Sequence, residues 1–316
     1  MQREEEFRLL VENQHDLVVK VDLDGRFEFV SPSYCKLFGK AESELLGHRF
    51  LPLVHEEDQA ATLRAMESLL QSPHQCQVEQ RAMTINGWRW LDWYDTAVLD
   101  DAGKVTSIIG AGRDVTDRKL VEAELRRTLE DVVHLLGRVV EHRDPYTSGH
   151  QNRVAQLARA IATRMGLPAH TIESVYMGGL IHDIGKMAVP AEILSKPGKL
   201  ASYEFTLIQQ HPLTGYDILR DLTFPWDIAK MVLQHHEKLD GSGYPHGISG
   251  DEILLEARIL TVADVVEAMA SHRPYRVALG IDTALAEINR NSGRHYDPEV
   301  VQACLSLFSE QAFAFE

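Results

Sequence analysis

The period of the hydrophobic pattern changes about one third of the way along the chain. In the first third, short runs of alternating or β-branched residues predict strands, which Asp-Gly, Asn-Gly or other polar turns mostly separate. Short helical patterns run from residue 31 to about residue 70. We expect an antiparallel sheet with helices on one face, in which strand alternation places Trp90 and Trp93 on opposite faces. The predicted strands cover residues 16–22, 27–30, 77–84, 88–99 and 105–114.

Helical spacing predominates in the rest of the chain. Residues 117–143 contain no proline and a single glycine, and their apolar residues recur at steps of three and four, which predicts an amphipathic helix. Such a helix either pairs with a second chain as a coiled coil or packs on the domain that follows it, and packing is the expectation for its second half. The residues of this stripe are Leu125, Leu129, Val132, Leu136 and Val139.

Two adjacent histidines precede a glycine-rich turn in the helical part. His235 extends the apolar stripe of residues 226–237, so its imidazole is expected to face the core and needs a partner there. His236 follows it, and Asp-Gly-Ser-Gly at 240–243 predicts a turn, either an ordinary one or one that lets backbone approach a ligand. A hydrogen-bonded structural histidine and a metal ligand are the two interpretations of His235, and further inward-facing ligands decide between them.

Other segments add histidines and aspartates to the predicted buried faces. His150 begins one apolar stripe, and His182 and Asp183 together close another. Asp264 lies within an apolar run, where an ionised carboxylate needs a compensating cation. His211 lies between two short helical patterns, and it is a candidate ligand only because the other candidate ligands accompany it. Imidazole and carboxylate ligands without cysteine suit Fe, Mn, Zn or Co better than a thiolate-rich structural zinc site.

Lys186 follows Asp183 at helical spacing, so both side chains are expected on one face of a helix. A lysine beside a metal site can bind a phosphate oxygen as a point charge. The ordinary role of such a residue is that of a solvated lysine at a helix end, which the helix dipole favours.

The order His, His-Asp, His, His-His, Asp resembles that of the HD superfamily of metal-dependent phosphohydrolases. Segments 182–186, 235–245 and 271–276 are similar to the motifs of an HD-GYP domain, with coverage from about residue 136 to the C-terminus. The resemblance implies an all-α helical bundle around a metal cluster. It also implies hydrolysis of cyclic di-GMP, or a related cyclic dinucleotide, to pGpG or GMP. Fe or Mn are the expected metals, with Zn, Co or Ni as alternatives.

The same resemblance assigns roles to individual residues. One metal would be held by His150, His182, Asp183 and Asp264. The other would be held by His211, His235 and His236, with Asp183 bridging the two. The residues expected to contact substrate are Lys186, Gly241, Gly243, Tyr244, Arg273 and Arg276.

Two cations explain how such a site would hydrolyse a phosphodiester. They lower the pKa of a shared water, present hydroxide to phosphorus and neutralise charge on the phosphate oxygens, so no protein nucleophile is required. Arg273 and Arg276 would grip phosphate directionally, whereas their ordinary role is surface salt bridging. Some family members bind a third metal through a glutamate at the position that Tyr146 occupies. The tyrosine therefore favours a two-metal site. Glu141 or Asp144 would be the donors to a third metal if the loop shifted.

The N-terminal elements resemble a PAS domain over about residues 6–118. The resemblance rests on Ser-Pro-Ser after the second strand, Leu-Gly at 46–47 and Gly-Arg-Asp-Val-Thr-Asp-Arg at 112–118. The PAS fold does not fix what the domain senses. His48, His55 and His74 are expected to be exposed or capping residues, with haem ligation as the alternative. Cys35 does not lie in the Asn-Cys-Arg type of flavin-photosensor motif.

Composition agrees with two domains joined by a helix, namely a PAS sensor at 1–118, a signalling helix or coiled-coil linker at 119–140 and an HD-GYP phosphohydrolase at 141–316. The 32 basic and 47 acidic residues give a net charge of −15, which argues against DNA binding. Three scattered cysteines suit a reducing cytoplasm, and no apolar run is long enough to span a bilayer. A homodimer through the sensor and the helix is expected. The acidic segment 4–6 resembles a helix leading into the sensor, as in a chain that continues upstream.

Two other functions stay open at this point. One is a phosphohydrolase that acts on another cyclic or linear nucleotide, which the Gly-Tyr-Pro extension at 243–245 and the paired arginines disfavour. The other is a non-catalytic signalling module that binds a cyclic dinucleotide. Such a module is expected to have lost metal ligands, whereas every expected ligand is present.

Overall fold

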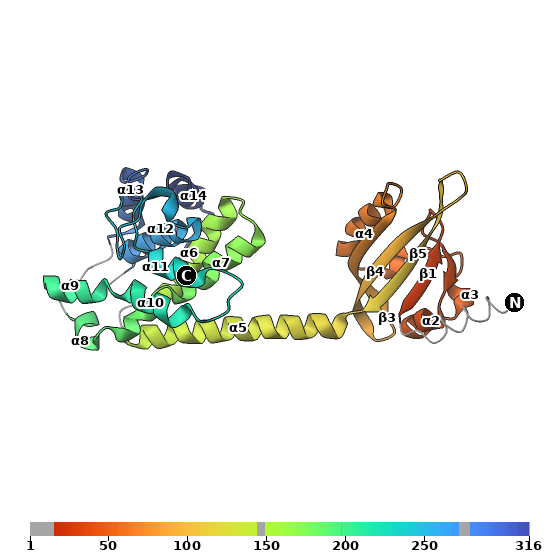
Figure 1. Ribbon diagram of the computed structural model, residues 1–316, viewed down its shortest axis with the longest axis horizontal. Coiled ribbons are helices and arrows are strands. Elements are labelled where there is room, and N and C mark those ends of the chain that lie inside the picture. The colour runs from red at the N-terminus through yellow and green to blue at the C-terminus, as the bar shows by residue number, and fades with distance from the viewer. Residues whose placement is uncertain (1–15, 144–148, 197, 272–278, 316) are drawn as a thin grey trace. The chain divides into compact units, whose positions relative to one another are not determined.

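The computed structural model describes residues 16–143, 149–196, 198–271 and 279–315. The chain divides into two compact units, Met1–Arg126 and Arg127–Glu316 (Figure 1). All the named strands lie in the first unit, and the second is built of helices. The predicted order, a domain with an antiparallel sheet and helices followed by a helical domain, is therefore confirmed. None of the helices among the described residues is long and apolar enough to cross a membrane.

The first unit contains a five-stranded sheet with the order β2-β1-β5-β4-β3. Every neighbouring pair of strands is antiparallel. The strands match the predicted ranges closely, except that β1 is one residue shorter at each end, β3 begins two residues earlier and β4 begins one residue earlier than expected. They are β1 (Leu17–Val21), β2 (Phe27–Val30), β3 (Gln75–Thr84), β4 (Gly87–Leu99) and β5 (Val105–Asp114).

Short helices between β2 and β3 pack their apolar residues against the sheet and close the core of this unit. His55 caps the last of them by accepting from the backbone N–H of Glu57, while His48 and His74 contact nearby backbone carbonyls. The three histidines therefore lie where capping and exposed histidines were expected. The helices are α2 (Pro32–Phe38), α3 (Glu42–Leu45), the 3-10 helix η1 (Leu51–Leu53) and α4 (Glu56–Ser68).

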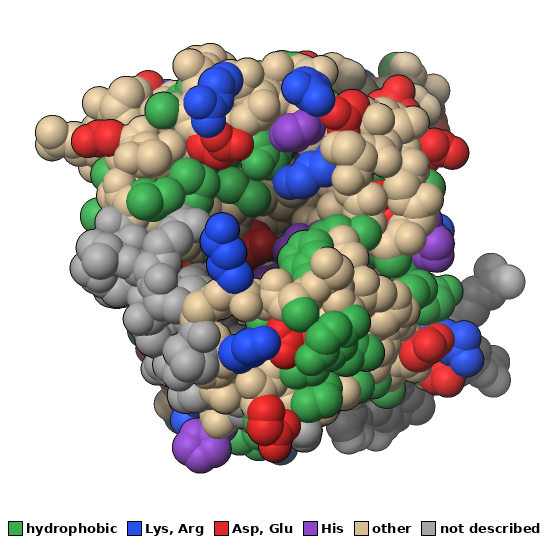
Figure 2. All heavy atoms as spheres, turned by 90° about the vertical axis from the view of Figure 1, so that its left-hand side faces the viewer, with side chains coloured by type: hydrophobic (Ala, Val, Ile, Leu, Met, Phe, Trp, Pro, Cys, Tyr) green, Lys and Arg blue, Asp and Glu red, His purple; other side chains and the backbone are tan. Residues whose placement is uncertain are grey.

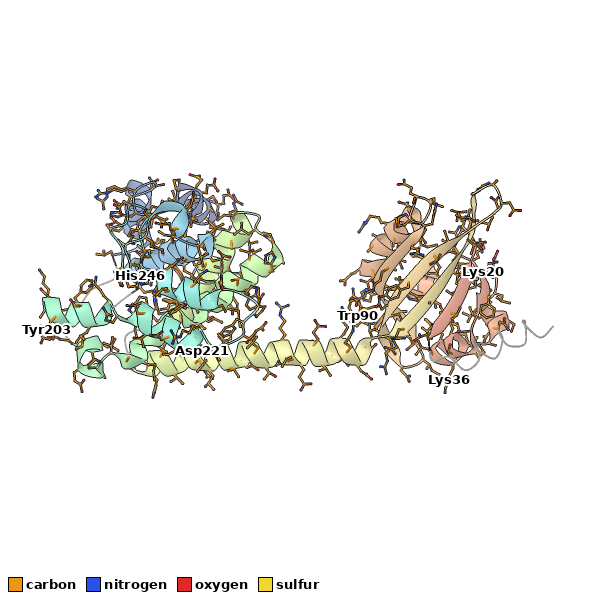
Figure 3. All side chains as sticks on the ribbon, in the orientation of Figure 1. Lys20, Lys36, Trp90, Tyr203, Asp221 and His246 are labelled. Atoms are coloured by element: carbon orange, nitrogen blue, oxygen red, sulfur yellow. The ribbon has the colours of Figure 1, made fainter. Side chains whose placement is uncertain are left out.

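Strand alternation separates the two tryptophans of β4 as predicted. Trp93 is 6% exposed and packs in the core of the first unit. Trp90 lies on the other face, near the start of α5 (Thr116–Arg143) (Figure 3). The guanidinium of Arg81 lies 5.2 Å from the centroid of its ring, and the ammonium of Lys119 lies 5.4 Å from it. The contact of Lys119 holds the first turn of α5 against the sheet.

The second half of α5 packs on the second unit, as expected. Val133 and Val140, one heptad apart, are both 2% exposed and belong to a buried cluster with residues of α7 (Ala169–Ile181). Gly137 lies between them, and a Cβ there would lie 2.7 Å from the carbonyl oxygen of Leu180, so glycine lets the two helices approach closely. The apolar stripe predicted from the sequence is exposed instead, from 36% at Leu129 to 69% at Leu125.

The core of the second unit is enclosed by α6 (His150–Arg164), α7 and α12 (Leu255–Ala270), which contact one another. The predicted stripe of α6 is buried, since Val154, Leu157 and Ile161 are each 0% exposed. The remaining helices are α8 (Ala191–Leu194), α9 (Ser202–Ile208), α10 (His211–Leu219), α11 (Ile228–Gln234), α13 (Ile281–Arg290) and α14 (Pro298–Ser309), with the 3-10 helices η2 (Ile184–Ala188) and η3 (Gly250–Glu252).

Candidate metal centre

The seven predicted metal ligands converge in the second unit. They form two groups, and within each group one ligand atom per residue lies within 4.8 Å of the others. The first group is His150, His182 and Asp264, and the second is Asp183, His211, His235 and His236. Five of these side chains belong to residues that are at most 2% exposed, namely His150, His182, Asp183, His211 and His235.

Most of the ligands lie at helix ends and not within helices. His150 and His211 are the first residues of α6 and α10, and His235 directly follows α11. Only Asp264 lies well inside a helix, α12. The predicted stripes ran through His182 and His235, which is one residue beyond the end of α7 and of α11. Helix ends suit a ligand because the chain can turn the side chain towards neighbouring segments.

Asp183 lies between the two groups. Its Oδ1 is 3.3 Å from Nε2 of His211, and its Oδ2 is 3.5 Å from Nε2 of His182 and 3.9 Å from Nε2 of His150. Asp264 completes the first group, with its Oδ1 3.3 Å from Nε2 of His150. The two oxygens of one buried carboxylate therefore face different groups of imidazoles.

Hydrogen bonds to backbone carbonyls orient three of the imidazoles in the same way. His182 donates from Nδ1 to Gly179 O at 2.7 Å, and His211 and His235 donate to the carbonyls three residues before them at 2.7 and 2.6 Å. Because a carbonyl only accepts, Nδ1 carries the proton and Nε2 keeps the lone pair that binds a metal. Nε2 of His182 is buried and lacks a hydrogen-bond partner among the described residues. A divalent cation fits this donor set and would satisfy that nitrogen.

Burial keeps most of these imidazoles neutral. It lowers the pKa of His211 to about 4 and that of His235 to about 3. It also holds the pKa of His236 well below its usual value, and the neighbouring His235 adds to this effect. At neutral pH these three side chains are therefore in the uncharged form, which is the form that binds metal ions.

The carboxylates of the site are ionised in spite of their burial. Burial alone would raise the pKa of Asp183, but Lys186 and the surrounding histidines outweigh it and hold the pKa well below its usual value. Burial would also raise the pKa of Asp264, but the hydrogen bond with His150 outweighs it and holds that pKa well below its usual value. Burial would lower the pKa of His150, yet hydrogen bonds with Asp264 and Glu267 raise it to about 9. The site thus presents two anionic ligands.

Lys186 does not lie on a continuation of α7, as the spacing had suggested. The chain leaves the α-helix after Ile181 and forms the 3-10 helix η2, in which residues three apart lie directly above one another. Nζ of Lys186 consequently lies 2.7 Å from Oδ2 of Asp183. The lysine is next to the metal ligands, as expected, although a different kind of helix places it there.

Gly185, in the same turn, lets η2 pack directly on α10. A Cβ at this position would lie 1.9 Å from the carbonyl oxygen of His211 and 2.6 Å from the backbone nitrogen of Gly215. We predict that Gly185→Ala lowers the free energy of unfolding by about 3 kcal/mol, because backbone atoms cannot move aside as a side chain can. Urea denaturation, followed over the unfolding transition of the second unit, measures this loss of free energy.

Gly166→Ala is the matched control for this prediction. An added Cβ at Gly166 meets nothing within 4 Å, and only its φ of +70° opposes the substitution. The expected loss is about 1 kcal/mol. Equal losses in the two variants would contradict the packing argument.

Glu267 is a site residue that the sequence reasoning missed. It is 1% exposed, and its carboxylate accepts from Nδ1 of His150, from Nε of Arg153 at 2.8 Å and from Oγ of Ser271 at 2.7 Å. The other oriented histidines use backbone carbonyls, so His150 is the one whose Nδ1 meets a carboxylate. Glu267 follows Asp264 by three residues on an apolar helix. The argument that singled out Asp264, a carboxylate in need of a cation, applies to it equally.

We predict that Glu267→Gln weakens metal binding about 10- to 100-fold, because the carboxylate orients His150 and raises its basicity. Calorimetric titration of the metal-depleted chain with Mn²⁺ measures the affinity. Glu256→Gln, at the first turn of the same helix and outside both ligand groups, is the control and should bind as wild type does. An unchanged affinity in Glu267→Gln would show that His150 needs no such support.

The glycine-rich loop packs back on the end of α11. Tyr244 stacks on His236, with ring centroids 4.7 Å apart, and Gly241 has a φ of +76°. A Cβ at Gly243 would lie 2.4 Å from Cα of Glu237, so this position requires glycine for close packing. The loop residues predicted to contact substrate therefore lie next to the second ligand group. Figure 2 shows a hollow in this unit, with histidine and acidic side chains in its depth and basic ones around it.

Five predicted positions lie outside the described residues or take another role. Arg273 and Arg276, together with Tyr146 and Asp144, are outside the described residues. Glu141, considered as a third-metal donor, accepts instead from the backbone N–H of Gly149 at 3.0 Å and of Gln151 at 3.1 Å. Its carboxylate caps the start of α6 and belongs to neither ligand group.

Comparison with known families agrees with this geometry. The sequence model of the HD domain matches residues 134–300, which is more than half of the chain. The chain belongs to the HD domain family. The model of the PAS fold matches residues 11–120, so the HD domain is preceded by a PAS domain.

Several curated proteins are similar to part of the chain. The cyclic di-GMP phosphodiesterase response regulator RpfG of Xanthomonas campestris is 41% identical over 187 residues, or 58% of this chain and 48% of that protein. The 3'3'-cGAMP-specific phosphodiesterase 3 of Vibrio cholerae is 42% identical over 175 residues, or 55% and 38%. A cyclic di-GMP phosphodiesterase of Thermotoga maritima is 40% identical over 184 residues, or 58% and 50%. The chain spans half or less of the length of these relatives.

Proposed function

We propose that the HD domain is a metal-dependent phosphodiesterase that hydrolyses cyclic di-GMP to pGpG, GMP or both. The observation that carries this proposal is the place of Asp183, whose Oδ2 faces His182 at 3.5 Å and whose Oδ1 faces His211 at 3.3 Å. A carboxylate placed in this way can be shared by two cations, and two-metal sites hydrolyse phosphodiesters. Relatives named as cyclic di-GMP phosphodiesterases, at 40 and 41% identity, support the substrate class.

In this proposal the seven ligands divide between two cations, with Asp183 common to both. His150, His182 and Asp264 complete the first site, and His211, His235 and His236 complete the second. Imidazole with carboxylate suits Fe or Mn, and Zn, Co or Ni are the alternatives. When bound, the two cations acidify a shared water and neutralise charge on the phosphate.

The chain's own residues position the substrate. Lys186, with its ammonium 2.7 Å from Asp183, is proposed to bind a non-bridging phosphate oxygen. Gly241 and Gly243 bring the loop backbone near the ligand groups, and the ring of Tyr244, stacked on His236, forms a wall beside them. Arg273 and Arg276 remain proposed phosphate contacts outside the described residues.

The proposal is tested by assaying the Mn- or Fe-loaded chain with cyclic di-GMP beside linear pGpG and by identifying the products. We expect turnover of the cyclic dinucleotide that metal chelation abolishes and re-addition of metal restores. A metal-replete preparation that binds cyclic di-GMP without turning over any cyclic dinucleotide would contradict the enzyme. It would favour a non-catalytic signalling module.

A second candidate substrate is 3'3'-cGAMP, which the name of the Vibrio cholerae relative at 42% identity favours. The two cyclic dinucleotides share the phosphodiester that the cations would activate and differ in one base. The ratio of their kcat/KM values under identical metal loading decides between them. A ratio that favours cyclic di-GMP supports the proposal, and the reverse ratio makes 3'3'-cGAMP the substrate.

We also propose that the chain forms a homodimer through the PAS domain and α5, and that the PAS domain regulates hydrolysis. The apolar stripe of α5 supports this, since it is exposed along its whole length and recurs at coiled-coil spacing. Light scattering is expected to give a dimer that Leu125→Lys converts to monomer, because a charge at an apolar seam is costly. Asp131→Lys, at an exposed position off the stripe, is the control. A monomeric wild-type chain would contradict the dimer.

A further inference from the structure

Glu141, in the last turn of α5, holds the start of the helix that carries His150. Its Oε2 accepts from the backbone N–H of Gly149 at 3.0 Å, and its Oε1 accepts from that of Gln151 at 3.1 Å. These two N–H groups flank His150, which is the first residue of α6 and a member of the first ligand group. A carboxylate at a helix start stabilises that start through its hydrogen bonds and through the helix dipole. The position of α5 therefore acts on the backbone of a predicted metal ligand.

The same stretch of α5 contacts the helix that leads to His182. Gly137 lies so close to Leu180 that an added Cβ would be 2.7 Å from the carbonyl oxygen. His182 follows Leu180 by two residues and also belongs to the first ligand group. Val133 and Val140 pack into the buried cluster that contains Leu180. The second half of α5 thus contacts the segments that carry two of the three residues of the first ligand group.

A buried amide next to this contact is left without partners. Gln151 is 2% exposed, and neither Oε1 nor Nε2 of its side chain has a hydrogen-bond partner among the described residues. Its Oε1 lies beside Gly137, at 3.6 Å from the position of an added Cβ. A buried polar group without a partner costs free energy. The docked position of α5 is therefore less stable than its apolar packing alone would make it, so a moderate force on α5 suffices to displace it.

We propose that Glu141 is a positioning residue that couples the place of α5 to the metal affinity of the first ligand group. With α5 docked, its carboxylate fixes the start of α6 and hence the place of the His150 imidazole. When α5 moves away, both hydrogen bonds are lost and His150 departs from the geometry that it shares with His182 and Asp264. The histidines of the second group are carried by α10 and by the chain after α11, so that group should respond less. This inference rests on the proposed function, because it concerns the metals of the same site, and it adds how that site is regulated.

Glu141→Gln tests the proposal, because the amide keeps the volume and one acceptor but turns an NH₂ group towards a backbone N–H. Calorimetric titration of the metal-depleted full chain with Mn²⁺ measures the affinities of the two sites. We expect one affinity to fall about tenfold and the other to change by less than about twofold. Asp297→Asn is the matched control, since the carboxylate of Asp297 accepts from two backbone N–H groups at the start of α14, outside both ligand groups. It should bind Mn²⁺ as wild type does.

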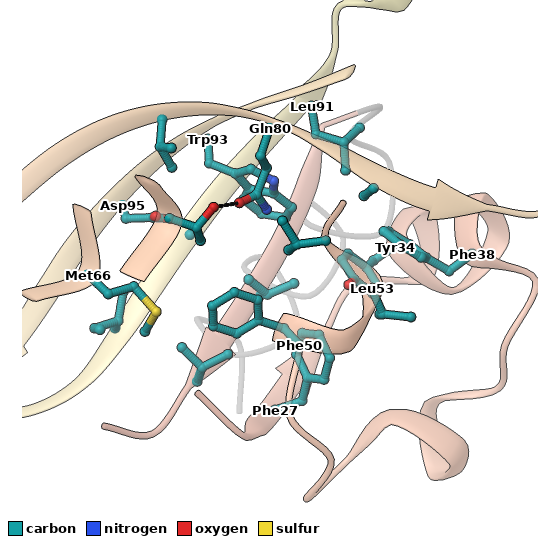
Figure 4. A pocket seen from close by; sticks show the side chains of 18 residues that line it. Phe27, Tyr34, Phe38, Phe50, Leu53, Met66, Gln80, Leu91, Trp93 and Asp95 are labelled. Atoms are coloured by element: carbon teal, nitrogen blue, oxygen red, sulfur yellow. Dashed lines mark hydrogen bonds between the residues drawn. The ribbon is translucent and has the colours of Figure 1, made fainter. Parts of the chain in front are cut away.

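Hydrogen exchange separates coupling from simple capping. Linkage is reciprocal, so a metal that binds better when α5 is docked must in turn hold α5 in its docked position. We expect Mn²⁺ to slow the exchange of residues 133–141 about tenfold in the wild type and to leave it unchanged in Glu141→Gln. Strand β4, whose Leu91 and Trp93 lie in the core of the first unit (Figure 4), is the internal reference. Its exchange should not respond to Mn²⁺ in either protein.

The possible failures are distinguishable. Wild-type affinity at both sites in Glu141→Gln, or an equal loss at both, overturns the coupling. Exchange of residues 133–141 that Mn²⁺ leaves unchanged in the wild type also overturns it. A folded wild-type chain that binds no Mn²⁺ overturns the proposed metal site and this inference together. Circular dichroism verifies the fold of each variant, and Glu141→Asp, which keeps the charge but shortens the reach, replaces Glu141→Gln if that variant unfolds and is expected to show the same selective loss.

Discussion

Replacing Asp183 with alanine is expected to lower the hydrolysis rate by about 10³-fold or more and to remove metal from the protein at the same time. Among the described residues, this side chain is the only one whose oxygens face both ligand groups, so neither cation would keep its full set of donors. Elemental analysis gives the metal content per chain, and product formation from cyclic di-GMP gives the rate. His235→Ala is expected to lose metal and turnover together as well.

The control for Asp183→Ala is Asp217→Ala on α10, which removes an exposed carboxylate paired with Arg220. Asp183→Asn keeps the volume and tests whether loss of charge alone suffices. Circular dichroism establishes that the variants are folded. Unchanged metal content in Asp183→Ala or His235→Ala would contradict the assignment of these residues as metal ligands.

Lys186→Ala is expected to retain both metals and to lose turnover by about 10²- to 10³-fold, because a positive charge that acts on the phosphate in the transition state would be gone. Because Nζ of Lys186 lies 2.7 Å from Oδ2 of Asp183, the same variant also tests a second role of the lysine. If the lysine served only to neutralise that carboxylate, its removal would change metal affinity and spare kcat. Metal titration and single-turnover kinetics on the same preparation separate the two.

Lys230→Ala is the matched control for Lys186→Ala. Lys230 also faces an aspartate three residues away, Asp227, at 3.7 Å, but the pair is exposed and lies outside both ligand groups. Its substitution should leave turnover and metal content unchanged. Wild-type turnover in Lys186→Ala would contradict a role of this lysine in binding phosphate.

The sequence predicted the strands of the first domain and the helices near the ligands of the second, because their hydrophobic periods are plain and the turns between the strands carry glycine and aspartate. It also predicted that His235 would be buried, since this residue extends an apolar stripe, whereas Asp264 is only half-buried among its apolar neighbours. It did not predict how the ligands converge, because that depends on which segments pack together. The 3-10 turn at Lys186 and the backbone contact of Gly185 arise from tertiary packing. The local hydrophobic period does not predict such packing.

The role of individual polar side chains was the least predictable part. Glu141 and Glu267 are both acidic residues near predicted ligands, yet one caps α6 and the other supports His150. Nothing in their spacing separates these roles, because both depend on partners that are distant in sequence or at a helix start. By contrast, the three backbone-bonded histidines follow a local rule, a carbonyl three residues earlier, that the sequence permits one to anticipate.

The contact of Gly185 with the backbone of His211 also bears on metal selection. It joins the turn that carries His182 and Asp183 to the turn that carries His211, main chain against main chain. Close-packed backbone atoms can move only slightly. Changes in side-chain torsions would therefore accommodate ions of different radius, while the two turns keep their separation. A mutation that changes the distance between the two ligand groups would then have to begin at this contact, because exchanging ligand types alone would leave that distance as it is.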